Sequence, residues 1–505
     1  MNNKCVQYMA ILTIALTLGC LAGCASTNEV NGEITYESEV IIPRDDASEV
    51  RMEGNRANIM NPIVGGAEEK AEKRRTEIVS SKDKLTIKGK KYYISPAGDD
   101  LNDGLSEKTP FRSLDVLSWL SLSEGDAILF ERGSVYRVTE PILVKDGVTY
   151  GAYGEGEKPC IYGSPQNYAD ATIWQPSRMK NVWKIDFGYG DAGNIVFNHG
   201  EYVGIKKMSG LNQLEKTGDF YHNETDGILY LYCEEGNPGK VYKDIEVSPK
   251  SSLFSLDQGV SNVTIDNLCM KYVGEFAING IHNNKNITVT NCEMGYIGGS
   301  KLSLAVRYGN AIQFWNGTQD TTVRNCWIYQ VYDTAITFQG TSKDAYTNIN
   351  FSDNLLEYND MDIEIWDNGE NFTIDNLVIE NNLLRYSAQG WGTRIEDSGN
   401  RGGAAGFQFI LGNCVSCSAT LKNNVFDCPA YESVDITTPK SNFNFDIEGN
   451  SVYINGDYRA NENAVRFGGL VGGKSPDSFK ATGQSELETA FKKFDKTATE
   501  IKWLQ

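Results

Sequence analysis

Two consecutive stretches of the chain decide its fold: Asn325-Cys-Trp-Ile-Tyr-Gln-Val-Tyr-Asp333-Thr-Ala-Ile336-Thr-Phe338 and Asn354-Leu-Leu-Glu-Tyr-Asn-Asp-Met-Asp362-Ile-Glu364-Ile365-Trp366. Aligned from Asn to Asn without gaps, Tyr329 falls on Tyr358, Asp333 on Asp362 and Ile336 on Ile365. Such self-similarity is typical of a solenoid whose successive coils stack on one another. We therefore predict that the two stretches are neighbouring coils.

Each stretch ends in a run of alternating apolar and polar side chains. Because successive side chains of a strand point to opposite faces, one set must face the core and the other must face outward. The core set is Thr334, Ile336, Phe338, Ile363 and Ile365, and the outward set is Asp333, Asp362, Glu364 and Trp366.

An Asn recurs along the second half of the chain, at Asn267, Asn291, Asn325, Asn354, Asn382, Asn424 and Asn450. Asn residues stacked at one turn position can bond to one another as an amide ladder, so we assign them a structural role. The two longest steps need inserted loops, which we expect near 298–309 and 391–403. Cys269, Cys292 and Cys326 follow ladder positions and are predicted to be buried thiols.

The bulk composition limits the possible partners. The chain has 505 residues, 40% of them hydrophobic, and a formal net charge of -20. Nucleic-acid binding relies on Lys and Arg, so this charge argues against nucleic acid and against an anionic membrane surface as partners. The abundant Tyr and Trp residues suit sugar rings, although most aromatic side chains serve packing.

The first coils resemble a known fold. Tyr92-Tyr-Ile-Ser-Pro-Ala-Gly-Asp-Asp100 and Thr109-Pro-Phe-Arg-Ser-Leu-Asp-Val-Leu117 look like the beginning of right-handed parallel β-helix proteins of the pectate-lyase-like superfamily. The resemblance implies an all-β, right-handed parallel β-helix with an N-terminal capping helix. Later segments, 307–315, 331–340 and 363–368, resemble the glycoside-hydrolase-like branch of these proteins.

The expected organisation has six parts. They are a signal peptide at 1–23, a polar tether at 24–89 that could carry one solvated helix, an N-terminal cap with the first coils at 90–163, a β-rich insertion at 164–245, the main coils at 246–474 and a C-terminal helical cap at 475–505.

The N-terminal segment is an export signal. An apolar run from Met9 ends in Leu21-Ala-Gly-Cys24, which resembles the lipobox of bacterial lipoproteins. The resemblance implies acylation of Cys24 and a protein lipid-anchored to the bacterial cell envelope, at the cell surface. We expect contact with the membrane through this anchor only.

The outward carboxylates form the candidate catalytic site. Stacking places Asp333 beside Asp362, with Glu275 two coils away in the same column, and Glu364 diagonal to Asp333 at roughly 7 to 8 Å. Carboxylates this close repel, so one should have a raised pKa. A protonated acid beside an ionised base suits glycoside hydrolysis, retaining at about 5 Å separation and inverting at about 6.5 to 9.5 Å. The branch resemblance implies Asp333 paired with Glu364 or Asp362.

Further polar and aromatic groups surround these carboxylates. We predict sugar contacts from Gln313, Trp315, Gln339 and Trp366 on the coils and from Trp391 and Arg394 on an inserted loop.

Three functions remain open. The first is hydrolysis of a polysaccharide or oligosaccharide without a cofactor or metal. The second is a polysaccharide lyase, with Ca²⁺ held by the acidic column and a base from Lys301, Arg307, Arg394 or Arg401. The third is a non-catalytic glycan-binding solenoid, in which the carboxylates are solvated surface groups. One fold hosts all three activities.

Overall fold

The computed structural model describes residues 65–82, 84–257, 259–411, 413–437, 443–468 and 477–504, which all belong to one compact unit spanning 44–505. The predicted signal peptide and Cys24 lie outside the described residues. Within the described ranges, no helix is both long and apolar enough to cross a membrane.

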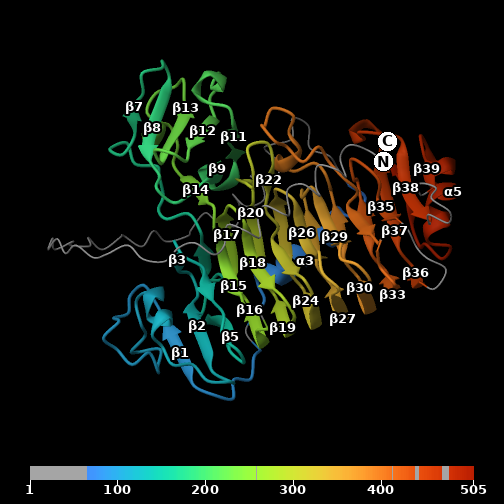
Figure 1. Cartoon of the computed structure of the whole chain (residues 1–505), viewed down its shortest axis with the longest axis horizontal. Helices are drawn as coiled ribbons and strands as arrows, with labels where there is room; N and C mark the ends of the chain where they lie inside the picture. Colours follow the sequence, from blue (N-terminus) through green and yellow to red (C-terminus); the bar gives the residue numbers. More distant parts are fainter. Residues whose placement is uncertain are drawn as a thin grey trace. The chain divides into compact units, whose positions relative to one another are not determined.

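Three long sheets wind together into a parallel β-helix (Figure 1). We call these sheets A, B and C. Each coil of the main body contributes one strand to each sheet, in the order C, A, B along the chain. Neighbouring strands pair in parallel except for β38 (Asn463–Gly468) with β39 (Ser478–Lys480). The fold predicted from the repeats is confirmed.

Sheet A consists of β1 (Lys91–Ile94), β2 (Ala127–Glu131), β5 (Thr149–Tyr153), β16 (Ser261–Asp266), β19 (Asn284–Thr290), β24 (Thr318–Arg324), β27 (Ala345–Ser352), β30 (Thr373–Glu380), β33 (Ser416–Lys422) and β36 (Asn444–Glu448). Sheet B consists of β3 (Val135–Arg137), β6 (Cys160–Tyr162), β17 (Cys269–Val273), β20 (Glu293–Ile297), β25 (Trp327–Val331), β28 (Leu355–Glu357), β31 (Leu383–Arg385), β34 (Val425–Asp427), β37 (Ser451–Asn455) and β40 (Ile501–Leu504). Sheet C consists of β4 (Ile142–Leu143), β15 (Ser252–Leu256), β18 (Phe276–Ile281), β23 (Ile312–Trp315), β26 (Thr334–Gly340), β29 (Met361–Asp367), β32 (Phe407–Ile410), β35 (Val434–Thr437), β38 (Asn463–Gly468) and β39 (Ser478–Lys480).

The core lies between the three sheets. Apolar side chains at equivalent positions stack coil on coil, as in the row Ile278, Ile312, Ile336, Ile363, Phe407 and Val434, all of them buried. The inward assignment of Ile336, Phe338, Ile363 and Ile365 is confirmed. That of Thr334 is wrong, because its hydroxyl bonds to the outward carboxylate of Glu364. Cys269, Cys292 and Cys326 are buried free thiols, as predicted.

The recurring Asn residues occupy two adjacent columns at the corner between sheets A and B, where one ladder was predicted. Asn267, Asn291 and Asn325 adopt positive φ of 53° to 59°, the left-handed turn conformation that Asn tolerates. Asn354, Asn382, Asn424 and Asn450 sit one residue later and are buried. In this second column each side-chain amide donates to the next at 2.8–3.0 Å, and Asn450 donates to Asp495.

The β-rich insertion forms two small sheets of its own. One contains β7 (Gln175–Pro176), β8 (Val182–Asp186), β11 (Ile205–Lys206), β12 (Asp219–Asn223) and β13 (Ile228–Tyr232). The other contains β9 (Ala192–Phe197), β10 (Tyr202–Val203) and β14 (Ile245–Pro249). Short helical turns, η2 (Asn198–Gly200), η3 (Leu211–Gln213) and α4 (Pro238–Val241), connect these strands.

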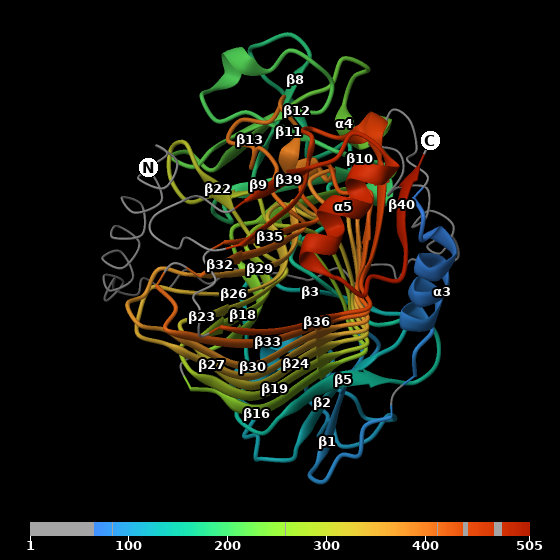
Figure 2. The same cartoon turned by 90° about the vertical axis from the view of Figure 1, so that its right-hand side faces the viewer.

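Both ends of the core are covered. At the first coils lies the 3₁₀ helix η1 (Leu114–Ser118), with Val116 buried. At the last coils the helix α5 (Gln484–Phe494) turns Leu487, Ala490, Phe491 and Phe494 into the core, and Figure 2 shows it lying across the open end. A turn η5 (Gly456–Tyr458) precedes β38.

The helix α3 (Glu68–Val79) packs on the outer face of sheet B (Figure 2), which corrects its assignment to a solvated tether. Arg75 donates to both carboxylate oxygens of Glu357 at 3.0 and 2.8 Å, and Glu68 pairs with Arg385 at 2.7 Å. Arg385 also pairs with Glu357 and Asp427 at 2.6 and 2.8 Å. The charged residues of α3 have no partner nearby in the sequence, because Glu357 and Arg385 lie about 280 residues or more away along the chain.

Candidate active site on sheet C

The outer face of sheet C carries two rows of polar and aromatic side chains. Parallel pairing places Asn279, Gln313, Thr337, Glu364, Gln408, Asp435 and Arg466 in one row, and Trp315, Gln339 and Trp366 in the next. The predicted register of Ile312 with Ile336 is confirmed. Figure 1 labels β26 and β29, which carry Thr337 and Glu364 of the first row and Gln339 and Trp366 of the second.

The predicted stacking of Asp333 on Asp362 is wrong. Ile336 pairs with Ile363 and Thr334 with Met361, so the residue level with Asp333 is Asp360. The two coils are offset by 28 residues in sheet B and by 27 in sheet C, whereas the ungapped alignment assumed 29. That alignment superposed Asn325 and Asn354, which belong to the two adjacent turn columns. The same pairing places Glu275 two coils before Asp333, as predicted.

Three carboxylates and one guanidinium meet at the corner where sheet C begins. Asp333 precedes β26, Asp360 precedes β29, and Glu364 points outward from β29. They are 6%, 1% and 7% exposed. Arg401, from the long loop before β32, places Nη2 2.9 Å from Asp333 Oδ1 and Nε 3.8 Å from Asp360 Oδ2.

Hydrogen bonds fix the orientation of Glu364. Its Oε2 accepts from Gln339 Nε2 at 2.5 Å and from the hydroxyls of Thr334 and Thr337 at 3.4 Å each. On the other side of β26, Asn310 donates to Gln313 at 2.9 Å, and Gln313 donates to Asn279 at 3.3 Å. The bonds to Glu364 join the coils of β26 and β29, and the bond from Gln313 to Asn279 joins the coils of β18 and β23.

Burial raises the pKa of all three carboxyl groups. For Glu364 the pKa is about 7, with the neighbouring Asp333 charge also raising it and Arg401 opposing. For Asp360 the pKa is about 8, with Asp333 and Glu364 adding to the effect of burial. Burial also raises the pKa of Asp333, but the ion pair with Arg401 lowers it and offsets part of this shift. Asp333 is therefore the member best placed to ionise, and Glu364 and Asp360 are placed to keep a proton.

Two tryptophans flank this cluster. Trp315 and Trp366 are half-buried, and their rings lie 6.4 Å apart at 35°. Gln339 lies between them in the row, and its amide reaches Glu364. The predicted sugar contacts Gln313, Trp315, Gln339 and Trp366 therefore lie together beside the carboxylates.

Three predicted site residues lie elsewhere. Asp362 is fully buried, and its oxygens accept from Asn359 at 2.9 Å and Ser387 at 2.5 Å, so it does not reach the surface. Trp391, in η4 (Trp391–Thr393), is also buried, with Nε1 bonded to the Gln330 carbonyl at 2.8 Å. Arg394 donates to the Val203 and Gly204 carbonyls at 2.7 Å each. The last two hold a loop in place and present no free group to a sugar.

Two members of the cluster were not assigned from sequence. Asp360 stands two residues before Asp362, and a two-residue gap in the alignment would have identified it. Arg401 was considered only as a lyase base, because nothing local connects a loop residue with a carboxylate 68 positions earlier.

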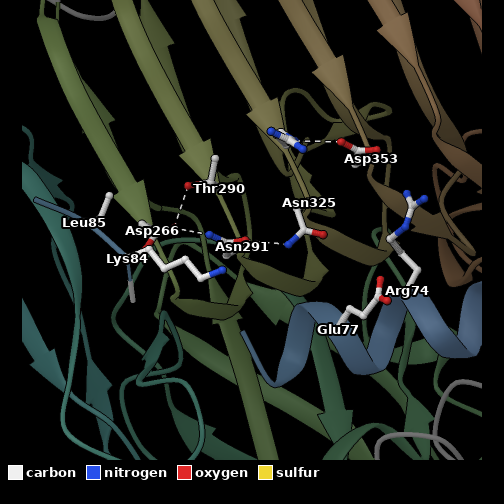
Figure 3. A pocket seen from close by; sticks show the side chains of 10 residues that line it. Arg74, Glu77, Lys84, Leu85, Asp266, Thr290, Asn291, Asn325 and Asp353 are labelled. Atoms are coloured by element: carbon white, nitrogen blue, oxygen red, sulfur yellow. Dashed lines mark hydrogen bonds and ion pairs between the residues drawn. The ribbon is translucent and has the colours of Figure 1, made fainter. Parts of the chain in front are cut away.

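A separate cavity of about 540 Å³ lies between α3 and the corner of sheets A and B (Figure 3). Its floor is the turn column, where Asn325 donates to Asn291 at 2.7 Å and Asn291 donates to Asp266 at 2.6 Å. The cavity has no aromatic lining residue, and its Asp266 and Asp353 are hydrogen-bonded or ion-paired. We therefore place the candidate active site on sheet C, despite the size of this cavity.

In the described part of the chain, no group of three or more His, Cys, Asp or Glu side chains is arranged to hold a metal ion.

Comparison with known proteins gives a weak sequence match and several similar folds. No protein-family model matches the chain. A curated lacto-N-biosidase from Bifidobacterium longum subsp. longum is 25% identical over 198 residues, which are 36% of this chain and only 12% of that protein. The chain thus matches about an eighth of that relative's length.

Among solved structures, a complex of XylC with xylose has a TM-score of 0.45 at 13% identity, covering 75% of this chain and 67% of that one. A family 28 exopolygalacturonase from Yersinia enterocolitica has a TM-score of 0.39 at 13% identity, covering 76% and 68%. The GH136 lacto-N-biosidase from Eubacterium ramulus has a TM-score of 0.29 at 13% identity, covering 76% and 70%.

Proposed function

We propose that the protein is a glycoside hydrolase that cleaves a polysaccharide or oligosaccharide on the outer face of sheet C. The observation that carries this proposal is the cluster of Asp333, Asp360 and Glu364, three buried carboxyl groups around Arg401 and beside two half-exposed tryptophans. The name of the curated relative, a lacto-N-biosidase, supports the same reaction class.

In this mechanism Glu364 is the acid and Asp333 the base. Glu364, with a pKa of about 7, donates its proton to the glycosidic oxygen as the bond from that oxygen to the anomeric carbon breaks. Asp333, whose ionised form the Arg401 guanidinium favours, removes a proton from the water whose oxygen bonds to the anomeric carbon. Asp360 keeps its proton near neutral pH and so limits the repulsion inside the cluster. After cleavage Asp333 carries the proton taken from water and Glu364 is ionised. Asp333 then releases its proton to solvent and Glu364 takes one up, which restores both groups.

The bound sugar would lie along the coils. Trp315 and Trp366 offer flat apolar faces for its rings, and Gln313 and Gln339 offer hydrogen bonds to its hydroxyl groups. The formal net charge of -20 disfavours polyanionic chains, because like charges repel. We therefore expect a neutral or amino-sugar substrate.

Product analysis tests the reaction class. The protein is incubated with neutral polysaccharides, uronic-acid polysaccharides and a lacto-N-bioside, with and without EDTA, while reducing sugar and the ultraviolet absorbance of unsaturated products are followed. Reducing ends without absorbance, unaffected by EDTA, are expected. Absorbance that is lost with EDTA would instead establish a Ca²⁺-dependent lyase, and binding without any product would establish a glycan-binding protein.

Substitution of Asp333 tests the assignment of the base. Asp333→Asn keeps the size of the side chain but cannot accept the proton, so turnover should fall at least about 100-fold. Asp375→Asn, at an exposed carboxylate on sheet A, is the matched control and should keep wild-type turnover. A folded Asp333→Asn variant with near wild-type turnover would remove this site from consideration.

We also propose that Cys24 carries a lipid that anchors the protein to the cell envelope. The motif Leu21-Ala-Gly-Cys24 after an apolar run supports this proposal. Metabolic labelling with a fatty acid should label the wild-type protein, and Cys24→Ala should abolish the label and release the protein from the membrane fraction. Equal labelling of the variant would refute the anchor.

A further inference from the structure

We propose that the β-rich insertion contributes to the active site, because it fixes the position of the loop that holds Arg401 between Asp333 and Asp360. We name residues 391–403 the site loop. The kinetic consequences rest on the proposed hydrolase function, whereas the positional argument rests only on contacts.

Asp397 joins the site loop to the insertion and to the hairpin of β21 (Ser300–Lys301) and β22 (Arg307–Tyr308). It is 3% exposed. Its Oδ1 accepts from the backbone N–H of Lys206, in β11, at 2.8 Å and from Arg307 Nη1 at 3.2 Å. Its Oδ2 accepts from Arg394 Nε at 2.9 Å. Three separate parts of the chain thus converge on one buried carboxylate.

The contacts continue from Asp397 to Arg401. The Ser398 N–H donates to the Lys206 carbonyl at 2.9 Å, and the Tyr332 hydroxyl donates to the Gly399 carbonyl. The Arg401 N–H donates to the Gly392 carbonyl at 3.0 Å. Because Tyr332 directly precedes Asp333, the Tyr332 hydrogen bond fixes the site loop at the corner of sheet C where the Arg401 guanidinium pairs with Asp333.

Arg401 faces titratable groups from several elements. Asp333 lies before β26, Asp360 and Glu364 belong to the corner and strand of β29, and the phenols of Tyr332 and Tyr431 lie beside them. A second guanidinium, that of Arg307, lies 4.5 Å from the Tyr332 ring but pairs with Asp397. Without Arg401, the three buried carboxyl groups would lose the cation that pairs with Asp333. Arg401 is therefore a positioning residue: it sets which carboxyl group ionises and need not touch the sugar.

The contribution of the insertion can be tested separately from that of Arg401. Arg394 forms no ion pair with Asp333, Asp360 or Glu364 in the described structure; its side chain donates to Val203 and Gly204 of the insertion and to Asp397. Arg394→Gln should loosen the site loop while leaving Arg401 in the sequence. Arg324→Gln, which removes an exposed ion pair with Asp353 far from sheet C, is the matched control.

The pH dependence of turnover is the kinetic test. The cation favours ionised carboxylates, so its loss should raise the pKa of acid and base together. Arg401→Gln should lower kcat at least about tenfold, change KM little and move both limbs of the pH profile to higher pH, and Arg401→Lys should restore part of the shift. Arg394→Gln should shift the profile in the same direction by less, and Arg324→Gln should not shift it.

Two results would overturn the proposal. A folded Arg401→Gln variant with an unchanged profile would remove Arg401 as the positioning residue. A shift in Arg401→Gln without any shift in Arg394→Gln would remove the role of the insertion.

Infrared titration tests the same point without turnover. The protonated-carboxyl band is followed with pH in wild type, Arg401→Gln and Arg401→Lys. In Arg401→Gln the band should persist to higher pH than in wild type, and superimposable titrations would overturn the proposal. If wild type cleaves no sugar at all, the proposed hydrolysis fails, but this titration still decides whether Arg401 controls the carboxyl groups.

Discussion

At the scale of single residues, surroundings decide what each carboxylate can do. Asp333, Asp360 and Asp362 lie within 30 positions of one another, yet the first meets Arg401, the second is buried beside two other carboxyl groups, and the third is saturated by Asn359 and Ser387. In the proposed mechanism one residue type therefore supplies a base, a retained proton and a structural hydrogen-bond acceptor. These differences depend on contacts from the site loop and from neighbouring coils.

The stability of the protein should depend on pH through Glu364 in the candidate active site. Its folded-state pKa is about 7, above the ordinary value of 4.5, so the folded state binds the proton more tightly than the unfolded state. The associated stability is present below pH 4.5 and is lost as the pH rises through 7. Glu364→Gln should therefore be more stable than wild type at pH 8, by about 1–3 kcal/mol, and should differ less at pH 4.

Thermal melts at the two pH values measure this difference, with Glu488→Gln, at an exposed carboxyl on α5, as the control. An equal effect of Glu364→Gln at both pH values would contradict the raised pKa.

At the scale of elements, the turns between sheets A and B hold the coils together through side chains. The left-handed column turns the chain, and the buried amide column satisfies backbone groups inside the turn. Asn382, for example, accepts from the Asn354 N–H at 3.0 Å and donates to the Phe351 carbonyl at 2.9 Å. Buried polar groups need such partners, so each amide supports two neighbouring coils.

Loss of one buried amide should weaken the fold strongly. Asn382→Ala leaves a buried N–H and a buried carbonyl without their partner, which should cost about 3–5 kcal/mol. Asn376→Gly is a close control, because Asn376 also donates to an Asn one coil away, Asn348, but at an exposed site, and glycine adopts its positive φ of 56° without strain. Chemical denaturation should show a change within about 0.5 kcal/mol for the control. Equal losses in the two variants would show that burial does not matter at this column.

Docking of α3 should depend on one buried ion pair. Arg75→Gln leaves Glu357, whose side chain is 2% exposed, without one of its two guanidinium partners. We expect a loss of about 2–4 kcal/mol and faster hydrogen exchange across Glu68–Val79. Lys73→Gln, on the exposed side of the same helix, should change neither. Unchanged exchange in Arg75→Gln would mean that apolar contacts alone hold the helix.

At the scale of the whole molecule, the β-helix is a stack whose last coil needs a cover. Exposed strand edges and an open core promote association between chains. Helix α5 supplies the cover at the C-terminal end, with Phe491 fully buried among Phe426 and Phe494. The side-chain amide of Asn450, the last member of the amide column, donates to Asp495 just after this helix.

Disruption of this cover should cause association. Phe491→Asp places a charge in the end of the core, so the protein should lose thermal stability and form oligomers or aggregates. Lys492→Asp, one residue later on the exposed face of α5, should keep the thermal stability and the association state of the wild type. Size-exclusion chromatography with light scattering measures the difference. A monomeric, normally melting Phe491→Asp variant would show that α5 is not needed to close the stack.

The sequence by itself determined the solenoid, the inward face of its strands, the positions of its two long loops and the surface on which Asp333 and Glu364 lie. These features follow from local patterns, because strand alternation and coil repetition are written in neighbouring residues. Only the tertiary structure decided that Asp360 stands level with Asp333, that Trp391 and Arg394 hold a loop, and that Arg401 completes the carboxyl cluster. The register between coils depends on the number of residues in each turn between strands. The partners of a loop depend on packing between segments that are far apart in the sequence. A local sequence pattern therefore determines neither.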